Sequence, residues 1–432
     1  MSNQIENFKH LISFLNSKEI DYALLGRRGS LQEIVDGDID LVISNKDFKN
    51  LSALVREFSI QHDLQMIQCF EHEITAKYYV LSDKKDHSMI SPDFCSAFMR
   101  DKRLLIPNEL LMRNRQSLSL ENQQLYTLTP EFEFTYYLLK KIDKKSLELS
   151  AINHLAMQFE ASNIELIKDL LSKYLRANTI ELICKEFETQ TPVNLHGLLP
   201  KISNELNKNI PIRASHYLLD LLLKVKRVLF KTGTSVAILG SDGSGKSSVI
   251  NGISVHLKSA FRKVQYYHLY PKSSEETKNP NTSPQAQSAY SFLISQIKLL
   301  HFASRYWRGC LNVYSKKVRS TFIIFDRYFD DIIVDNKRFR YKGPQLPLKL
   351  VHWFIPKPAV YIYLNAPSDV IFKRKAELPI QELDRQQEVY LSLLKKKKQG
   401  FVINANQELD RVIFDAESKV LDYLEQRQLK RT

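Results

Sequence analysis

The sequence has few cysteines and no long hydrophobic segment. Its four cysteines, Cys69, Cys95, Cys184 and Cys310, are widely separated, and no two of them form a Cys-x-x-Cys pair. Scattered cysteines of this kind are typical of reduced thiols in a cytoplasmic protein, and we expect that compartment. No run of about 18 consecutive apolar residues occurs, so the sequence predicts no transmembrane helix.

Other patterns are missing as well. The 11 histidines lack the paired spacing of zinc ligands, so we expect no zinc site. Glu6, Lys9 and His10 interrupt the apolar pattern at the N-terminus, which predicts an amphipathic helix over residues 1–17 and not a signal peptide. There are no internal repeats. The 432 residues therefore suffice for two or three ordinary globular domains.

The charge of the chain is strongly positive. A net charge of +14 and an isoelectric point near 9.3 favour anionic partners, which include nucleotides, nucleic acid and an acidic membrane surface. The densest cluster, Lys395–Lys398, follows an apolar helical pattern. It is either a solvated helix end or a weak contact with an anionic membrane. The sequence leaves the oligomeric state open, a homodimer included.

The order of patterns along the chain predicts a mixed α/β fold with three parts. Residues 1–129 alternate strands with a helix over 47–58, and the later strands are expected at 65–70, 76–81 and 87–94. In residues 130–230 apolar residues recur at spacings of three and four positions, which predicts a helical region. In residues 231–432 the α/β alternation resumes, and a mostly parallel sheet with helices on both faces is expected. A Pro- and Ser-rich stretch at 271–288 predicts a long loop.

A phosphate-binding loop is the most specific motif. Residues 240–247 fit the pattern G-x-x-x-x-G-K-[ST], directly after an apolar strand and at the start of a helix. Backbone N–H groups of such a loop and the helix N-terminus bind phosphates. Lys246 is expected to reach the β- and γ-phosphates of ATP, and Ser247 to ligate Mg²⁺. The predicted ATP-binding residues are Gly240, Gly243, Ser244, Gly245, Lys246, Ser247 and Ser248.

A second buried strand, over residues 321–325, ends at Asp326 and Arg327. Ligands bind at the carboxyl ends of strands in open α/β sheets. We therefore expect Asp326 to hold the metal through water or to accept a proton, and Arg327 to contact an acceptor phosphate. A strand-ending aspartate that only caps the next helix is the alternative.

From about residue 234 onward the sequence resembles thymidylate kinase. ILGSDGSGKSS is similar to that family's P-loop, and Asp326–Tyr328 is similar to its Asp-Arg-Tyr motif. The resemblance implies that Asp242 meets the acceptor sugar and that Arg305, on the preceding helix, holds the acceptor phosphate. It also implies a lid that begins near residue 372, in which Arg374, with Lys375 second, supplies a cation to the transferring phosphoryl group.

The segment after Asp326 departs from the thymidylate kinase pattern for the thymine base. It is instead similar to thymidylate-kinase-like proteins encoded among bacterial polysaccharide genes, which share D-R-x-x-x-D, R-x-x-x-G-P and R-K-x-E-L motifs. That resemblance adds Arg340 to the expected substrate-binding residues. It indicates the reaction and not the substrate, so a nucleotide, a sugar and a glycan intermediate all remain possible acceptors. The corresponding positions here are Asp326, Arg327, Asp331, Arg340, Gly343, Pro344, Arg374, Lys375, Glu377 and Leu378, with two residues and not three between Arg340 and Gly343.

The N-terminal region carries paired carboxylates. Asp38 and Asp40 are two residues apart at the start of an apolar strand, so both side chains face the same way. Two such carboxylates commonly hold Mg²⁺, and Asp93 on a later strand is the expected third ligand. A strand, a glycine loop at residues 26–30 and D-x-D together resemble the nucleotidyltransferase fold of polymerase-β-like enzymes. A solvated acidic turn is the alternative.

Three functions follow from these motifs. The first is an ATP- and Mg²⁺-dependent kinase that acts on a phosphate- or hydroxyl-bearing acceptor. The second is a nucleotidyltransferase that modifies a protein or RNA through Asp38 and Asp40. The third is a non-enzymatic, ATP-gated adaptor that the positive charge attaches to a membrane or nucleic acid.

Overall fold

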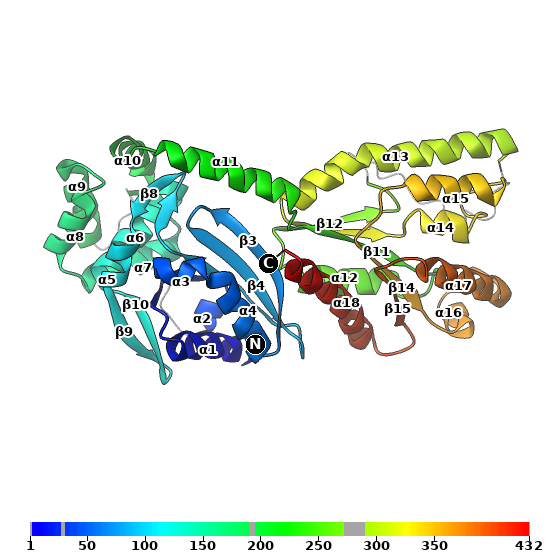
Figure 1. The fold of residues 1–432 in the computed structure, drawn as a ribbon, viewed down its shortest axis with the longest axis horizontal. Helices are drawn as coiled ribbons and strands as arrows, with labels where there is room; N and C mark the ends of the chain where they lie inside the picture. Colours follow the sequence, from blue (N-terminus) through cyan, green and yellow to red (C-terminus); the bar gives the residue numbers. More distant parts are fainter. Residues whose placement is uncertain (1, 27–30, 190–194, 272–289, 432) are drawn as a thin grey trace. The chain divides into compact units, whose positions relative to one another are not determined.

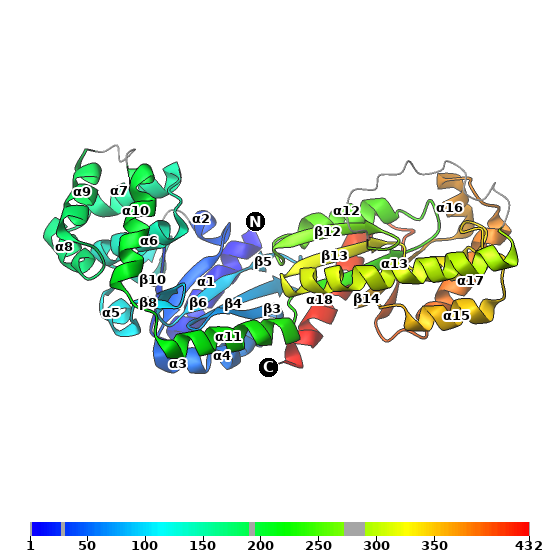
Figure 2. The same cartoon turned by 90° about the horizontal axis from the view of Figure 1, so that it is seen from above.

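The computed structural model describes residues 2–26, 31–189, 195–271 and 290–431. The chain divides into two compact units, residues 1–226 and 227–431 (Figures 1 and 2). Two parts of the sequence-based prediction, glycine-loop residues 27–30 and most of the loop at 271–288, lie outside the described residues. Among the helices that are described, none is long and apolar enough to cross a membrane.

The first unit combines a twisted sheet with many helices. Its elements, in chain order, are α1 (Ser2–Ser17), β1 (Tyr22–Leu24), α2 (Leu31–Val35), β2 (Ile39–Ile43), α3 (Asn45–Lys49), α4 (Leu51–Gln61), β3 (Leu64–Glu73), β4 (Ala76–Asp83), β5 (Met89–Ile90), β6 (Pro92–Cys95), β7 (Phe98–Arg100), β8 (Arg103–Ile106), α5 (Asn108–Arg113), β9 (Arg115–Leu120), β10 (Gln123–Leu128), α6 (Pro130–Lys144), α7 (Leu149–Glu160), α8 (Ile164–Ser172), α9 (Ala177–Glu188), α10 (Leu195–Asn209) and α11 (Ala214–Leu229), which contains the boundary between the units.

The main sheet of this unit has an apolar core on each face. Its strands are ordered β3-β4-β6-β2-β1-β10-β9, and β5 pairs with β4. Side chains of a strand alternate between faces, so Tyr22 and Leu24 pack with residues of α1 and α4, whereas Ala23 packs with residues of α6 to α10. Each half of the unit thus has its own core.

The predicted N-terminal helix and the strands near 65–70 and 76–81 are confirmed as α1, β3 and β4. The single strand expected at 87–94 is wrong in detail, because it is divided into β5 and β6 around Ser91. The single helix expected over 47–58 is also divided, since α3 ends at Lys49 and α4 begins at Leu51, with Asn50 between them.

The second unit is a three-layer α/β structure. Its elements are β11 (Thr234–Leu239), α12 (Lys246–His256), β12 (Lys263–His268), α13 (Phe292–Val318), β13 (Thr321–Asp326), α14 (Asp330–Val334), α15 (Gln345–Phe354), β14 (Val360–Asn365), α16 (Ser368–Arg374), α17 (Ile380–Leu394), β15 (Gly400–Asn404) and α18 (Leu409–Leu429).

Its sheet has the order β12-β13-β11-β14-β15, and neighbouring strands in it run parallel. All six residues of β11 are buried, as expected for a central parallel strand covered on both faces. Ala237 and Leu239 pack with residues of α13, α15 and α17, and Figure 1 shows α12 and α18 on the opposite side of the sheet. The predicted α/β class and parallel sheet are confirmed.

The basic run at residues 395–398 is not uniformly solvated. Lys395, Lys396 and Lys398 are exposed, but the side chain of Lys397 is only 9% exposed and its Nζ lies 2.7 Å from the buried Asp330 carboxylate. His352 lies 3.2 Å from the same oxygen. Lys397 therefore joins the α17–β15 connection to α14. The solvated helix end, one of the two alternatives for this run, is wrong at Lys397.

Candidate active site

The P-loop lies at the carboxyl end of the central strand β11. Gly243 and Gly245 have φ angles of +91° and +90°, where residues with a side chain are strained. A Cβ at Gly243 would also lie 3.1 Å from the carbonyl oxygen of Ile371 and 3.1 Å from the Cβ of Lys375. These glycines let the chain turn tightly from β11 into α12, so that the first N–H groups of the helix point into the loop.

Lys246 begins α12 and folds back over this loop. Its Nζ donates to the carbonyl oxygens of Gly240 and Ser241, both at 2.8 Å, and its side chain is only 8% exposed. Burial, together with the nearby charge of Arg327, lowers the pKa of Lys246 to about 8. The ammonium is thus held where a phosphate group would compensate its charge.

Asp242, inside the P-loop, links two other segments. It forms ion pairs with Arg327, which follows β13, and with Arg338, which follows α14. Although burial opposes it, the charges of Arg327, Lys246 and Arg338 hold the pKa of Asp242 well below its usual range. Arg327 also donates to Asp331 at 2.7 Å, so the buried guanidinium is fixed by two carboxylates.

Asp326 ends β13 beside the P-loop strand, where its register partner is Ile238 of β11. Its Oδ2 accepts a hydrogen bond from Tyr266 at 2.9 Å, whereas its buried Oδ1 has no hydrogen-bond partner among the described residues. Ser247 is exposed at the start of α12. Hydroxyl and carboxylate oxygens are suitable ligands for Mg²⁺, so the side chains of Ser247 and Asp326 could both coordinate this ion.

The remaining arginines expected at the site lie in different surroundings. Arg305, on α13, donates to the hydroxyl of Tyr270, and Arg340 lies over the ring of Tyr290 at 4.0 Å. Arg374, at the end of α16, is exposed and donates to the carbonyl oxygen of Ala405 at 3.3 Å. Its neighbour Lys375 is the residue that packs against Gly243 of the P-loop.

Sequence reasoning missed Arg338. It chose Arg340 from a short motif, yet Arg338 makes the ion pair with Asp242. Arg338 is positioned by the Asp335 side chain, which accepts from its backbone N–H at 2.9 Å. The spacing Asp335-x-x-Arg338 was the available signal, because an aspartate commonly accepts from an N–H two or three residues later in a turn.

A parallel sheet whose central strand leads through a glycine loop into a helix that starts with lysine defines the class of P-loop phosphate-binding proteins. Within this class, residues 238–425 match the family model described as Thymidylate kinase. The match indicates an ATP-dependent nucleotide kinase in this part of the chain.

Two solved structures are similar over part of the chain. Thymidylate kinase from Candida albicans is 21% identical, with 43% of this chain and 89% of that chain covered and a TM-score of 0.33. Thymidylate kinase from Ehrlichia chaffeensis is 13% identical, with 43% and 96% covered and a TM-score of 0.30. The search of curated proteins found no match.

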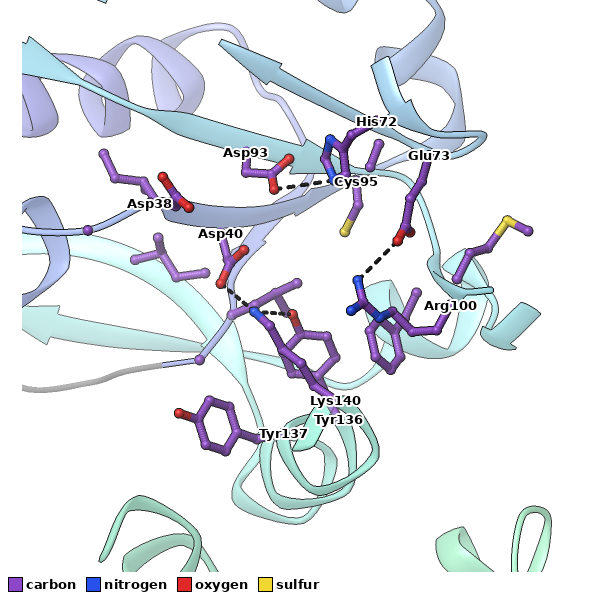
Figure 3. Close-up of a pocket in the computed structure, with 18 of the residues that line it drawn as sticks. Asp38, Asp40, His72, Glu73, Asp93, Cys95, Arg100, Tyr136, Tyr137 and Lys140 are labelled. Atoms are coloured by element: carbon purple, nitrogen blue, oxygen red, sulfur yellow. Dashed lines mark hydrogen bonds and ion pairs between the residues drawn. The ribbon is translucent and has the colours of Figure 1, made fainter. Parts of the chain in front are cut away.

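The first unit contains a separate cavity of about 420 Å³ (Figure 3). Strand β2 brings Asp40, and strand β6 brings Asp93, to adjacent positions, since the two residues are register partners in a parallel pair. Asp38, just before β2, lines the same cavity. Burial, together with the charges of Asp40 and Asp38, raises the pKa of Asp93 to about 8. The three predicted carboxylates thus surround one space.

Basic side chains of α6 line the other side of this cavity. Lys140 donates to Asp40 at 2.7 Å (Figure 3). Lys141 and Lys144 also line the space. Within the described residues, no group of three His, Cys, Asp or Glu side chains is close enough to hold a metal ion. The carboxylates therefore do not form a protein-only metal cage. Mg²⁺ commonly completes its coordination with phosphate oxygens and water.

Proposed function

We propose that the C-terminal unit is an ATP- and Mg²⁺-dependent kinase that phosphorylates a nucleotide, a sugar or a glycan intermediate of polysaccharide biosynthesis. The observation that carries this proposal is the arrangement around the P-loop. Lys246 is held over the loop, and Asp242 joins it to Arg327 and Arg338. The P-loop, which would bind ATP, therefore lies next to the guanidinium groups of Arg327 and Arg338. These two cations suit an anionic acceptor.

Each residue has a role in this proposal. Phosphate oxygens of ATP replace the two carbonyls now bound by Lys246. Asp242 and Arg338 orient the acceptor, and Arg327 neutralises charge on the transferred group. The acceptor oxygen attacks the γ-phosphorus while the bond from this phosphorus to the β–γ bridging oxygen breaks and ADP leaves. When the acceptor is a hydroxyl group, its proton passes to the Asp326 carboxylate. Catalysis rests on positioning and on charge stabilisation.

Ser247 and Asp326 are the residues proposed to hold Mg²⁺, directly or through water. The unpartnered Oδ1 of Asp326 supports this assignment, since a buried carboxylate oxygen without a hydrogen bond is costly unless a cation or water satisfies it. When bound, Mg²⁺ neutralises charge on the β- and γ-phosphates. Lys375, which packs against Gly243, and Arg374 are the two candidates for a cation that closes over the transferred group.

The test is phosphoryl transfer from γ-labelled ATP to a panel of nucleoside monophosphates, free sugars and extracted glycolipids. The full-length protein is compared with Lys246→Ala and with Lys349→Ala, a matched lysine that is exposed on α15. We expect one acceptor class to become labelled, with the labelling lost in Lys246→Ala and retained in Lys349→Ala. Full transfer by Lys246→Ala would overturn the proposal. Binding of ATP without transfer to any acceptor would favour the ATP-gated adaptor.

The cavity of the first unit supports a second candidate, nucleotidyl transfer to a protein or RNA. The acidic wall with Asp38, Asp40 and Asp93 and the basic wall with Lys140 and Lys144 together suit a magnesium–triphosphate complex. Its size of about 420 Å³ lies within the ordinary range for small-molecule sites. Lys140, which now neutralises Asp40, would turn to the phosphates.

This second candidate is tested with α-labelled ATP in the Lys246→Ala background, which removes the kinase reaction. Label transferred to protein or RNA should disappear in Asp40→Asn. It should persist in Asp36→Asn, because Asp36 is exposed and is not among the residues that line the cavity. Equal labelling by both variants would rule out the cavity as the site.

A further inference from the structure

The second unit contains another cavity, at the amino ends of β11 and β14, whereas the P-loop follows the carboxyl end of β11. It has a volume of about 280 Å³. Segments far apart in the chain form it, namely residues 231–235, the C-terminal half of α13, residues 356–359 and the end of α18. In Figure 1 the C-terminal ends of α13 and α18 both lie near the start of β11.

The charge of this cavity is of one sign. Among the described residues that line it there are three lysines and two arginines but no aspartate or glutamate, and the five cations are Lys231, Lys317, Lys357, Arg427 and Arg431. Like charges brought together in a partly buried space repel one another, and water cannot screen them as it does at an open surface. This concentration of charge needs an explanation.

The arginines have structural partners that account for part of the charge. Arg427 donates to the carbonyl oxygens of Thr232 at 2.8 Å and Gly233 at 3.1 Å, and Arg431 donates to that of Lys231 at 3.0 Å. They therefore hold the segment before β11 against α18. The ammonium of Lys231 lies 4.1 Å from the ring centre of Tyr314.

The charge of Lys317 is not accounted for by contacts of this kind. Its side chain makes no hydrogen bond or ion pair with the residues that the structure describes, although it is partly buried at the end of α13. Burial, together with the charges of Lys231 and Arg427, lowers the pKa of Lys317 to about 8. An anion in the cavity would remove this repulsion.

We propose that this cavity is a second anion site, which binds a phosphate or diphosphate group through Lys317 and Lys231. The lining supports a phosphate carried by a small organic molecule, because Tyr306, Phe325 and Tyr328 provide an aromatic wall beside the cations. A bound anion would accept charge-assisted hydrogen bonds, which are stronger than those between neutral groups. The site is independent of the P-loop kinase reaction.

The test uses inorganic pyrophosphate as the probe. It is titrated calorimetrically into full-length Lys246→Ala, in which the P-loop lysine is removed, and into the same protein with Lys317→Gln or Lys349→Gln added. We expect the affinity to fall roughly 10-fold or more with Lys317→Gln, because a charge-assisted contact is lost, and to be unchanged with Lys349→Gln. Circular dichroism confirms that all three proteins are folded.

A parallel arm distinguishes the source of the phosphate. The same proteins are mixed with phosphatidylcholine vesicles that contain phosphatidic acid. Lys317-dependent binding of pyrophosphate assigns a soluble ligand, and Lys317-dependent binding of vesicles alone assigns a lipid-borne phosphate, so either result supports the site. Equal binding by the Lys317→Gln and Lys349→Gln proteins, or no binding of either probe, overturns the proposal.

Discussion

The ammonium of Lys397 and the carboxylate of Asp330 lie 2.7 Å apart, and the aspartate side chain is fully buried. His352 lies 3.2 Å from the same carboxylate, and Lys397 also lies over the ring of Tyr361 at 3.8 Å. Hydrogen bonds and charges from His352 and Lys397 hold the pKa of Asp330 below its usual value although burial opposes this. A lysine within a run of four thus anchors α14 in the interior.

Replacement of Lys397 should therefore destabilise the second unit. We expect Lys397→Met to lower the free energy of unfolding by about 3–5 kcal/mol, because Asp330 would lose its main buried counter-charge. Lys396→Met, an exposed neighbour, should change it by no more than about 0.5 kcal/mol. Urea denaturation of the full chain measures both. Similar values for the two variants would show that the buried pair contributes little.

The two arginines after α14 should differ in their effect on catalysis. Arg338→Gln leaves Asp242 without one of its two arginine partners, so kcat/KM for the acceptor should fall roughly 10- to 100-fold, the range for loss of a charged hydrogen bond. Arg340→Gln should have a smaller effect, since Arg340 stacks on Tyr290. Steady-state kinetics with the labelled acceptor class provides the comparison. A larger loss in Arg340→Gln would favour the motif-based assignment instead.

Lys317 should make stability depend on pH in a defined direction. Its folded pKa of about 8 lies below the usual 10.5, so between these values the unfolded chain binds more protons than the native one. The free energy of unfolding then rises with pH in this window, and each pKa unit corresponds to about 1.4 kcal/mol. Without a bound anion, Lys317→Gln should be more stable than wild type at pH 7.

That difference should shrink as the pH approaches 10, where the native lysine is neutral. Denaturant titrations at pH 7, 8.5 and 10 measure the trend, with Lys349→Gln as the exposed comparison. If the stability difference between wild type and Lys317→Gln does not change with pH, burial and neighbouring charges do not destabilise the Lys317 ammonium in the folded protein.

In the first unit, Glu133 fixes the glycine that flanks the acidic cavity. Its fully buried carboxylate accepts from the N–H of Gly26 at 2.8 Å, and His154 lies 3.3 Å away. Glu133→Ala should cost about 1–3 kcal/mol of unfolding free energy, because buried polar groups lose their partner. Glu160→Ala, an exposed change on α7, should be nearly neutral. Thermal unfolding would detect the contrast, and equal melting temperatures would contradict it.

The features that the sequence predicted well are those encoded by neighbouring residues. The P-loop is one continuous stretch after an apolar strand, so its motif already contains the geometry of strand, turn and helix. The burial of β11 and β13 on both faces follows from uninterrupted apolar runs. The D-x-D spacing of Asp38 and Asp40 likewise fixes their common direction.

Features that depend on distant segments were not predictable in this way. Whether Arg338 or Arg340 reaches Asp242 depends on how the chain turns after α14, and both are arginines of one short loop. Lys397 is buried because Asp330, 67 positions earlier, needs a counter-charge there. The cationic cavity joins Lys231 to Arg431, 200 positions apart, and no local pattern connects them.

The position of Asp242 has a consequence for how the two substrates of the proposed kinase would bind. One carboxylate of the donor loop holds Arg338, which belongs to the opposite side of the site. The Asp242 carboxylate also lies 3.8 Å from the ammonium of Lys246. An acceptor that binds Arg338 through its own negative charge would compete with Asp242, which would then have one fewer counter-charge. Binding of the two substrates would thereby be coupled. The measured affinity for ATP should therefore depend on whether the acceptor is bound, even before any phosphoryl transfer.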